Sequence, residues 1–193
     1  MRDRVARLLP IRQGHFRLES GHHGHTWVDL ELLFLYPDRI RRLTTQLATA
    51  LRSHRPEVVC GPLVEGAFVA MMVAPRLRVP FTYAERIADD TLSGLYPVRY
   101  RLPGALREVV RGRRVAIVND VINAGSAIRG TYTDLVACGA QPVAVATLAV
   151  LGGRAAEFAA ANQIALETLA ALPNEIWEPA VCPLCRDGVP LNN

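Results

Sequence analysis

Hydrophobic and polar positions follow two patterns along the chain, one typical of buried strands and one typical of helices. Mostly apolar runs at 58–60, 115–118 and 143–151 predict buried strands, 80–83 predicts a further strand, and 166–172 predicts an edge strand. Apolar positions at helical spacing predict helices at 40–51, 66–77, 128–138 and 154–162. This alternation of strand and helix predicts a single α/β domain with a mostly parallel twisted sheet and helices on both of its faces.

Other stretches complete the predicted order of elements. Residues 1–10 suggest a short helix that Pro10 ends, and 27–33 has the composition of a strand. Asp38 is the expected cap of the helix over 40–51. Between 85 and 113 no clean period appears and several glycines and prolines occur, which predicts a long loop or a hairpin. Loops of this length are usually functional or disordered.

Composition narrows the function classes. The chain has 193 residues, a net charge of +4, and no lysine among its 22 basic side chains. Without lysine there is no Schiff base to pyridoxal phosphate and no P-loop. The positive charge suits anionic small molecules as well as nucleic acid, but no dense arginine run with interleaved aromatics favours nucleic acid. No signal peptide and no apolar stretch of membrane-spanning length is present, so we expect a cytoplasmic protein without membrane partners.

The segment 114–131 carries the clearest chemistry. The polar pair Asn119-Asp120 follows a buried apolar run, and the small residues Ala124, Gly125 and Ser126 then lead into a helix. Such a turn lets the backbone approach an anion, and the helix directs free N–H groups and its positive dipole end at the same place. Side-chain donors from Asn123 and Ser126, and acceptors on Asp120 for a sugar diol, predict a sugar-phosphate ligand. The alternative is a plain strand-to-helix turn that packs small residues and binds nothing.

This segment resembles the phosphoribosyl-pyrophosphate (PRPP) signature of the type I phosphoribosyltransferases. Three more segments resemble the orotate phosphoribosyltransferases within that family: Gly14-His-Phe-Arg-Leu-Glu-Ser-Gly21, Cys60-Gly-Pro-Leu-Val-Glu-Gly-Ala67, and Cys182-Pro-Leu-Cys-Arg-Asp-Gly-Val-Pro-Leu191. Together the four segments extend over nearly the whole chain in the family's order.

The resemblance implies a Mg²⁺-dependent pentosyltransferase that moves the phosphoribosyl group from PRPP to orotate in pyrimidine nucleotide synthesis and releases pyrophosphate. It implies a homodimer, a hood at 1–36, a mobile loop at 85–113 and a tail at 173–193. Asp120 and Arg86 are the implied catalytic residues. The implied PRPP-binding residues are Asn119, Asp120, Asn123, Ala124, Gly125, Ser126 and Ala127, and the pyrophosphate loop is Leu63, Val64, Glu65, Gly66 and Ala67. Arg86, Arg99 and Arg101 are the mobile-loop charges, and Phe16, Ser20, Gly21, His22 and His23 shape the base pocket.

The chain also departs from the family pattern. Asn119 stands where the family has the first of two acids, and Asn123-Ala124-Gly125 replaces a turn with two threonines. The family's loop lysines are missing, and its orotate-binding Asp-Arg pair is replaced by Leu151-Gly152, with Arg154 slightly further on. These departures leave two alternatives open, a PRPP- or nucleotide-binding regulatory module with weak or no catalysis, and a transferase for a different base.

Histidines and cysteines suggest a metal in two places. The histidines of 21–25 can ligate zinc, but adjacent histidines rarely point at the same ion, and contact of His22 or His23 with the base is the favoured interpretation. Cys182 and Cys185 supply half of a zinc site, but Cys60 and Cys138 belong to predicted buried elements, so we expect a structural tail with reduced thiols. The only metal expected is Mg²⁺ held through PRPP, with no direct protein ligand.

Overall fold

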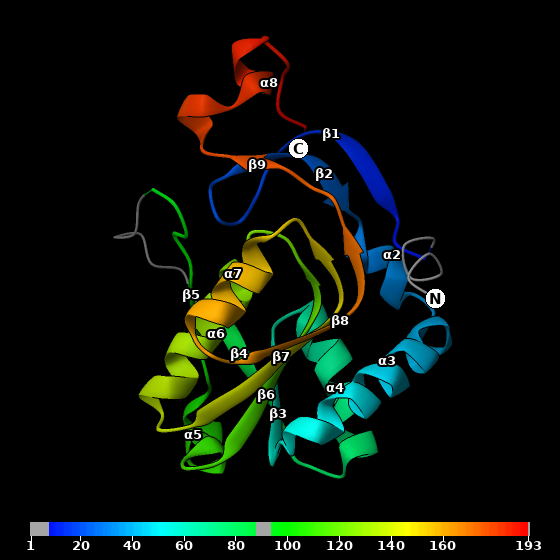
Figure 1. The fold of residues 1–193 in the computed structure, drawn as a ribbon, viewed down its shortest axis with the longest axis vertical. Helices are drawn as coiled ribbons and strands as arrows, with labels where there is room; N and C mark the ends of the chain where they lie inside the picture. Colours follow the sequence, from blue (N-terminus) through cyan, green and yellow to red (C-terminus); the bar gives the residue numbers. More distant parts are fainter. Residues whose placement is uncertain (1–7, 88–93, 193) are drawn as a thin grey trace.

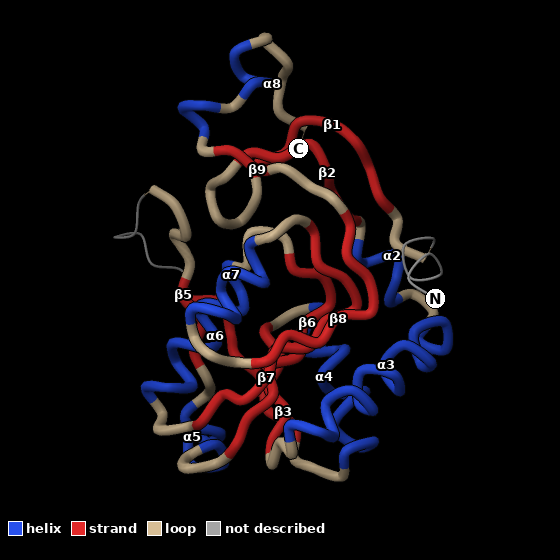
Figure 2. Tube along the Cα trace, in the orientation of Figure 1, coloured by secondary structure: helices blue, strands red, loops and turns tan. Residues whose placement is uncertain are grey.

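The computed structural model describes residues 8–87 and 94–192, and its centre is a six-stranded sheet. Figures 1 and 2 show this sheet in the lower part of the molecule, with helices on both sides. From edge to edge the strands are β5 (Arg99–Arg101), β4 (Phe81–Ile87), β3 (Val58–Pro62), β6 (Arg114–Ile122), β7 (Gln141–Leu151) and β8 (Ala165–Leu172). All neighbouring pairs are parallel except β4 and β5, which form an antiparallel hairpin. The predicted fold class is confirmed.

Both faces of the sheet are buried because alternate residues of each central strand enter different cores. On one face, residues such as Val59, Val118 and Ala146 pack under α3 (Pro37–Leu51) and α4 (Glu65–Leu77). On the other face, residues such as Cys60 and Ile117 pack under three helices. These helices are α5 (Gly104–Val110), α6 (Ser126–Ala137) and α7 (Arg154–Ala161). The apolar runs in the sequence therefore reflect burial on two sides.

A second, smaller sheet lies beside the carboxyl ends of the parallel strands, at the top of Figure 1. Its strands are β1 (Ile11–Arg17), β2 (His23–Val28) and β9 (Ile176–Trp177), all antiparallel. A 3-10 turn, η2 (Pro179–Val181), and the short helix α8 (Pro183–Arg186) follow β9. The chain then returns to β1, where Asn192 bridges to Phe16. Segments from the two ends of the sequence thus build one small unit above the larger sheet.

Two expectations about the amino-terminal half are wrong. Residues 30–33 were expected to continue a strand, but they belong to the helix α2 (Leu30–Phe34). Leu30, Leu33 and Phe34 have helical spacing and pack on the core, whereas Leu32 between them is exposed. Asp38 does not cap α3, which begins with Pro37 after Tyr36 and ends before the 3-10 turn η1 (Arg52–His54). Proline suits a first helical position, where its missing N–H is not needed.

The segment 85–113 is only in part a loop. It begins with the β4–β5 hairpin and ends with α5, a helix that the sequence pattern did not predict. Residues 88–93 lie outside the described residues, as do residues 1–7, where most of the short amino-terminal helix was expected. In the described part of the chain, no helix is long and apolar enough to cross a membrane.

Candidate active site

The turn after β6 presents unpaired backbone donors at the start of α6. Gly125 has φ +87°, a left-handed conformation that glycine adopts without strain, and it reverses the chain into the helix. No side chain caps α6, and the first helical hydrogen bond is donated by the Arg129 N–H to the Gly125 carbonyl. The N–H groups of Ser126, Ala127 and Ile128 therefore have no acceptor within the helix. The position and polarity of these groups suit an anion.

A cavity of about 220 Å³ opens directly onto this turn. One wall is the turn itself, with Asn119 and residues 121–128, together with Leu151 at the end of β7; Asp120 is buried behind this wall and does not line the cavity. The opposite wall comes from the hood and includes Glu19, Ser20 and Trp27. The structure therefore brings the predicted phosphate-binding turn and part of the predicted base-side segment to one cavity.

Asp120 is a buried acid near the end of β6. Burial raises the pKa of its carboxyl group to about 7, and the negative charge of Glu65 adds to the increase. Its backbone carbonyl accepts a hydrogen bond of 2.7 Å from the Thr147 hydroxyl on the neighbouring strand β7. A buried carboxylate with these surroundings gains from any ligand that brings hydroxyl donors or a cation close to it.

The predicted pyrophosphate loop meets this turn at one close approach. Gly66, in the first turn of α4, lies against Asn119, so a Cβ atom at this position would overlap the Asn119 amide oxygen. The same amide donates from Nδ2 to the Val121 carbonyl over 3.1 Å. In the loop, Val64 is exposed, Glu65 and Leu63 are half-buried, and the Leu63–Val64 peptide bond is cis. The two segments implied to bind PRPP are therefore neighbours at the carboxyl ends of β3 and β6.

Tyr96 links the base-side segment to the phosphate turn, and sequence analysis did not single it out. Its N–H donates to the Ser20 carbonyl over 2.7 Å, and its hydroxyl donates to the Ala124 carbonyl over 3.3 Å. Its ring meets the ring of His22 edge-on, with centroids 5.4 Å apart. The preceding Gly94 carbonyl lies close to Gly21. Tyr96 follows a stretch without periodicity, so no local pattern marked it.

Arg129 is a second site residue that sequence analysis missed. Its guanidinium group lies between two rings, 5.0 Å from the centroid of Tyr96 and 4.9 Å from that of Phe158. Its Nε is buried and has no hydrogen-bond partner among the described residues. Its helical position, three residues after Ser126, was the available signal, because it places a cation next to the free N–H groups.

The three arginines predicted to cover pyrophosphate belong to the β4–β5 hairpin. Arg86 forms an ion pair of 3.2 Å with Glu19, and its side chain is 61% exposed. Tyr100 donates a hydrogen bond of 3.0 Å to the same carboxylate, so Glu19 joins the hairpin to the cavity wall. Arg99 and Arg101 flank Tyr100 on β5 and are exposed. An exposed guanidinium such as that of Arg86 carries five N–H donors, more than its pair with Glu19 uses.

Arg154 approaches the base-side segment from the start of α7. Burial lowers the pKa of His22, and the positive charge of Arg154 lowers it further. His22 Nδ1 lies 2.9 Å from the Ser20 hydroxyl. Arg154 lines a second cavity of about 380 Å³ together with Gly152, Asn174 and neighbouring residues, and it also pairs with Glu157 over 3.3 Å. The structure thus brings a cation to the base side although the family's Asp-Arg pair is absent.

Of the five predicted base-pocket residues, Ser20 lines the cavity and Gly21 and His22 lie beside it in the chain, whereas Phe16 and His23 face other parts of the hood. Phe16 is buried against Trp27, with ring centroids 5.7 Å apart, and does not line the cavity. His23 does not line it either, because its ring faces His15 and Cys185. His22 contacts Ser20 and Tyr96 just before β2 begins, whereas His23, the first residue of β2, contacts His15 and Cys185.

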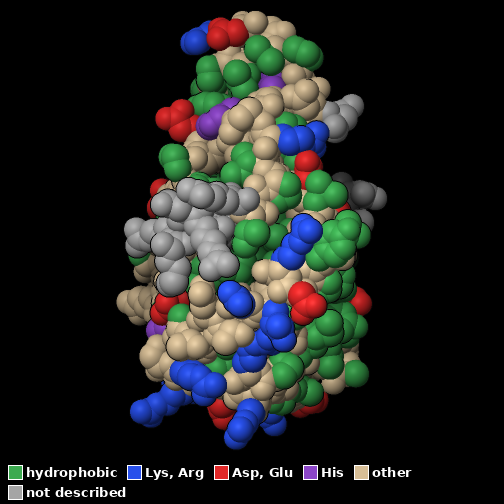
Figure 3. Space-filling model, turned by 90° about the vertical axis from the view of Figure 1, so that its right-hand side faces the viewer, with side chains coloured by type: hydrophobic (Ala, Val, Ile, Leu, Met, Phe, Trp, Pro, Cys, Tyr) green, Lys and Arg blue, Asp and Glu red, His purple; other side chains and the backbone are tan. Residues whose placement is uncertain are grey.

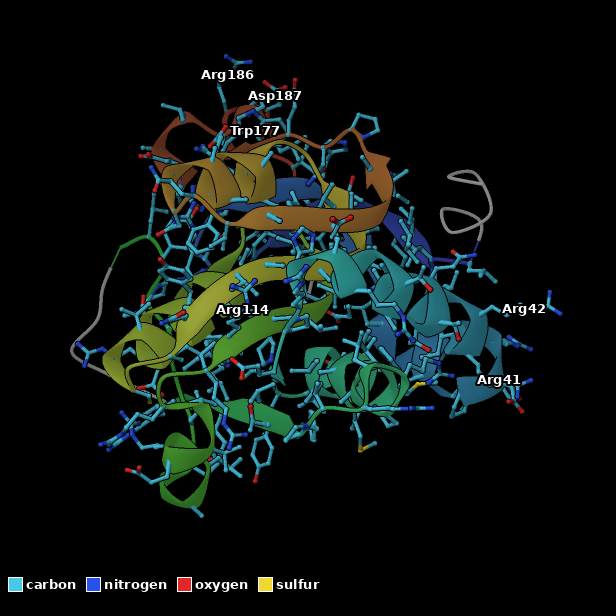
Figure 4. All side chains as sticks on the ribbon, turned by 60° about the horizontal axis from the view of Figure 1, so that its bottom comes forward. Arg41, Arg42, Arg114, Trp177, Arg186 and Asp187 are labelled. Atoms are coloured by element: carbon cyan, nitrogen blue, oxygen red, sulfur yellow. The ribbon has the colours of Figure 1, made fainter. Side chains whose placement is uncertain are left out.

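Positive charge is also present far from the cavity. Figure 3 shows arginine side chains gathered over the lower half of one face, with acidic side chains among them. Arg41 and Arg42 point away from the molecule on the outer side of α3 (Figure 4). Arg41 pairs with Asp38 over 3.5 Å, and both side chains are largely exposed. Such exposed pairs contribute little to stability, so these arginines are suitable controls for the site.

Comparison with known proteins agrees with this geometry. Residues 35–172 match the model of the phosphoribosyl transferase domain. The chain is 33% identical over 185 residues to orotate phosphoribosyltransferase of Heliobacterium modesticaldum, covering 93% of this chain and 88% of the relative. It is 29% identical over 185 residues to the enzyme of that name from Caldanaerobacter subterraneus subsp. tengcongensis, covering 96% and 90%.

Solved structures share the fold. The crystal structure of orotate phosphoribosyltransferase from Aeropyrum pernix superposes with a TM-score of 0.63 at 23% identity, covering 86% of this chain and 93% of that one. Adenine phosphoribosyltransferase from Trypanosoma brucei gives a TM-score of 0.68 at 16% identity, covering 88% and 78%. At such identities the likeness establishes the fold alone. With the family match over most of its length, the chain belongs to the phosphoribosyltransferases, enzymes of the glycosyltransferase type, and among them it is most like the orotate phosphoribosyltransferases.

Proposed function

We propose that this enzyme is a Mg²⁺-dependent orotate phosphoribosyltransferase. The single observation that carries the proposal is the cavity in which the free amides of α6 face the hood residues Glu19 and Ser20. That cavity offers an anion site and a base side within one enclosure. The curated relatives named orotate phosphoribosyltransferase match nearly the full length of the chain, which supports orotate as the acceptor.

In this proposal the turn after β6 holds the ribose 5-phosphate. The N–H groups of Ser126 and Ala127 donate to the phosphate, with help from the Asn123 amide and the Ser126 hydroxyl. Gly125 and Ala124 leave room for the phosphate because their side chains are absent or small. Asp120 accepts hydrogen bonds from the ribose diol. The Arg129 guanidinium adds positive charge beside the same amides.

The reaction exchanges one bond at C1 of the ribose. The bond from C1 to the pyrophosphate oxygen breaks, and pyrophosphate leaves with the electron pair. The bond from C1 to a nitrogen of deprotonated orotate then forms with the electron pair of that nitrogen. The intervening centre has oxocarbenium character, so catalysis depends on positioning and on electrostatics more than on a covalent side chain. Such chemistry can proceed without the family's lysines, because Arg86 stays protonated and binds pyrophosphate.

The surroundings of Asp120 fit a magnesium complex of PRPP. Burial is the main cause of the raised pKa of Asp120 and the negative charge of Glu65 adds to it, so the positive charge of such a complex would favour the ionised carboxylate. The loop 63–67 would receive the pyrophosphate, and Gly66 allows this loop to pack directly against Asn119 of the phosphate turn. When bound through the oxygens of PRPP, Mg²⁺ would neutralise the charge of the departing pyrophosphate.

On the base side we propose that Arg154 binds the orotate carboxylate. Its charge already reaches His22, which lies with Ser20 and Gly21 in the base-side segment. Arginine binds carboxylates with paired, charge-assisted hydrogen bonds, and this would replace the missing Asp-Arg pair of the family. Phe16 would support the pocket indirectly by packing behind Trp27.

The remaining parts of the chain have roles in the same proposal. Residues 1–36 form the hood on the base side, 85–113 closes over pyrophosphate, and 173–193 is the tail that joins the hood. We further propose that the enzyme acts as a cytoplasmic homodimer. Sedimentation of the purified chain distinguishes a dimer from a monomer directly.

One assay tests the proposed reaction. The purified protein is mixed with PRPP, Mg²⁺ and orotate, and loss of orotate absorbance is followed with time. We expect turnover with wild-type protein and with the exposed control Asp38→Asn, and a loss of at least about 100-fold in Asp120→Asn. Turnover with another base but not with orotate would reassign the acceptor. PRPP binding by calorimetry without turnover on any base would instead support a regulatory binding module.

A further inference from the structure

Four metal-binding side chains meet in the hood, outside the cavity described above. His15 comes from β1, His23 from β2, and Cys182 and Cys185 from the start of α8. One ligand atom from each residue lies within 4.8 Å of all the others. Three of the four residues are buried, and Cys185 is exposed. Their sequence separation is large, since His15 and Cys182 are 167 positions apart.

The distances between these atoms are those of ligands around one ion. Tetrahedral zinc, with Zn–N of about 2.0–2.1 Å and Zn–S of about 2.3 Å, places two nitrogens about 3.3 Å apart and a nitrogen and a sulfur about 3.6 Å apart. Here His15 Nε2 lies 3.0 Å from His23 Nδ1 and 3.5 Å from Cys182 Sγ. Cys185 Sγ lies 3.7 Å from His15 Nε2 and 3.2 Å from His23 Nδ1. All four distances are within about half an ångström of the tetrahedral values.

The Val189 carbonyl fixes the His15 ring in the tautomer and orientation that metal binding requires. His15 Nδ1 lies 2.7 Å from the Val189 carbonyl, which can only accept, so Nδ1 carries the proton and Nε2 presents its lone pair to the cluster. Asn192 holds the backbone on both sides, because its Oδ1 accepts from the His15 N–H and its N–H donates to the His15 carbonyl. The ring of His15 is therefore locked with the metal-binding nitrogen facing the other three ligands.

We propose that His15, His23, Cys182 and Cys185 bind a structural zinc ion that joins the carboxyl-terminal segment to the hood. Two thiolates and two imidazoles form a closed Cys₂His₂ set, which favours Zn²⁺ and leaves no open position for a substrate. The Cys-x-x-Cys spacing at the start of a short helix is common in such sites. None of the four residues lines the proposed substrate cavity, so this zinc is distinct from the magnesium of the reaction.

Few other contacts hold the carboxyl-terminal segment to the rest of the hood. Residues 178–192 are mostly exposed, and β9 contributes only two paired residues to the small sheet. Val181, Val189 and Leu191 are 70%, 40% and 41% exposed, so little apolar surface fixes this segment. A small unit with a minor core usually needs a metal or a disulfide to be stable, and the cysteines here are free. Zinc binding would supply that free energy directly.

Metal content is the first test. Full-length protein without a metal-binding tag is purified, dialysed and analysed by mass spectrometry for zinc, iron, copper and nickel. We expect about one zinc per chain in wild type, and loss of most of it in Cys182→Ser, Cys185→Ser and His23→Asn. Cys138→Ser and His54→Asn are matched controls outside the cluster and should keep the zinc. Wild type without zinc, iron in its place, or equal zinc in all variants would overturn the proposal.

A second test needs no variant and remains informative if the cysteine variants fail to fold. A thiol-blocking mercurial is titrated into native wild-type protein while released zinc is read with a chromogenic chelator. Release of one zinc as two thiols react supports the site, and absence of release, or a disulfide between Cys182 and Cys185, overturns it. Trypsin cleavage after Arg186, which points outward in Figure 4, should become faster once zinc is removed. Both readouts need no substrate, so they are separate from the proposed transferase activity.

Discussion

Gly66 on α4 and Asn119 on β6 pack so closely that no side chain fits between them. The contact joins the loop proposed for pyrophosphate to the turn proposed for the ribose phosphate. The Asn119 amide is also held through its nitrogen, since Nδ2 donates to the Val121 carbonyl. Any atom added at Gly66 must therefore move the amide of Asn119 or the ring of Pro62, whose Cγ would lie 3.0 Å from the added atom.

Replacing this glycine should damage the site more than the fold. Alanine normally stabilises a helix relative to glycine by about 1 kcal/mol, but in Gly66→Ala the overlap with Asn119 should cost about 1–3 kcal/mol. We expect kcat/KM for PRPP to fall at least about tenfold, with a small decrease in Tm. Gly104→Ala is the matched control, because it begins α5 with nothing within 4 Å of the added atom. Equal activity of both variants would contradict the proposed contact.

Asp120 should make stability depend on pH. Burial raises its pKa to about 7 in the folded protein, whereas the unfolded chain has the ordinary value near 3.8. The folded state then holds the proton more tightly, so its contribution to stability is full below about pH 4 and is lost as pH rises through about 7. Asp120→Asn has no charge to bury, and its Tm relative to wild type should rise between pH 4 and pH 8.

Thermal unfolding without substrate at pH 4, 6 and 8 measures this dependence. At pH 8 the variant should be more stable than wild type by several degrees, while its PRPP turnover is lost. Asp38→Asn, whose side chain is 93% exposed, should change Tm equally at all three values. A Tm difference for Asp120→Asn that stays constant with pH would mean that the carboxyl group is not perturbed.

The fold could be predicted from the sequence because burial leaves a local signature. The run 115–118 is apolar throughout, and 143–151 is apolar except at Thr147, since alternate residues enter two different cores. The prediction of secondary structure failed where one segment fits both the strand pattern and the helix pattern. Leu30 to Phe34 satisfies both a strand and a helix pattern over five residues, and only packing on the core decides between them.

The candidate site was predictable only where it is continuous in sequence. The turn 119–127 carries its own pattern and the loop 63–67 was implied by the family resemblance, but Tyr96 and Arg129 reach the site through contacts that tertiary structure creates. His15 and Cys182, which also contact each other, are separated by 167 positions in the sequence. Cys182 and Cys185 suggested half a metal site, and the two histidines that we propose as its other ligands lie in a hairpin where a bulge sets which side chains face inward.

Arg154 should control binding of the base and not of PRPP. A charge-assisted hydrogen bond to a carboxylate is worth about 1.5–3 kcal/mol, so Arg154→Ala should raise KM for orotate at least about tenfold. KM for PRPP should change less than about twofold, since the phosphate turn is not touched. Arg42→Ala, on the exposed side of α3 in Figure 4, is the matched loss of one positive charge. If both variants raise KM equally, the effect is general electrostatics and not contact with the base.

Gly125 should be needed both for the fold and for the phosphate. Its φ of +87° costs an alanine about 1 kcal/mol, so Gly125→Ala should lower Tm by about 2–4 °C. Relief of this strain would shift the first N–H groups of α6, and we expect the Kd for PRPP, measured by calorimetry, to rise about tenfold. Gly112→Ala has comparable strain, with φ +68° and nothing within 4 Å, but lies outside the site. It should show the same decrease in Tm with unchanged PRPP affinity, and a weakened affinity there would show that strain alone explains the effect.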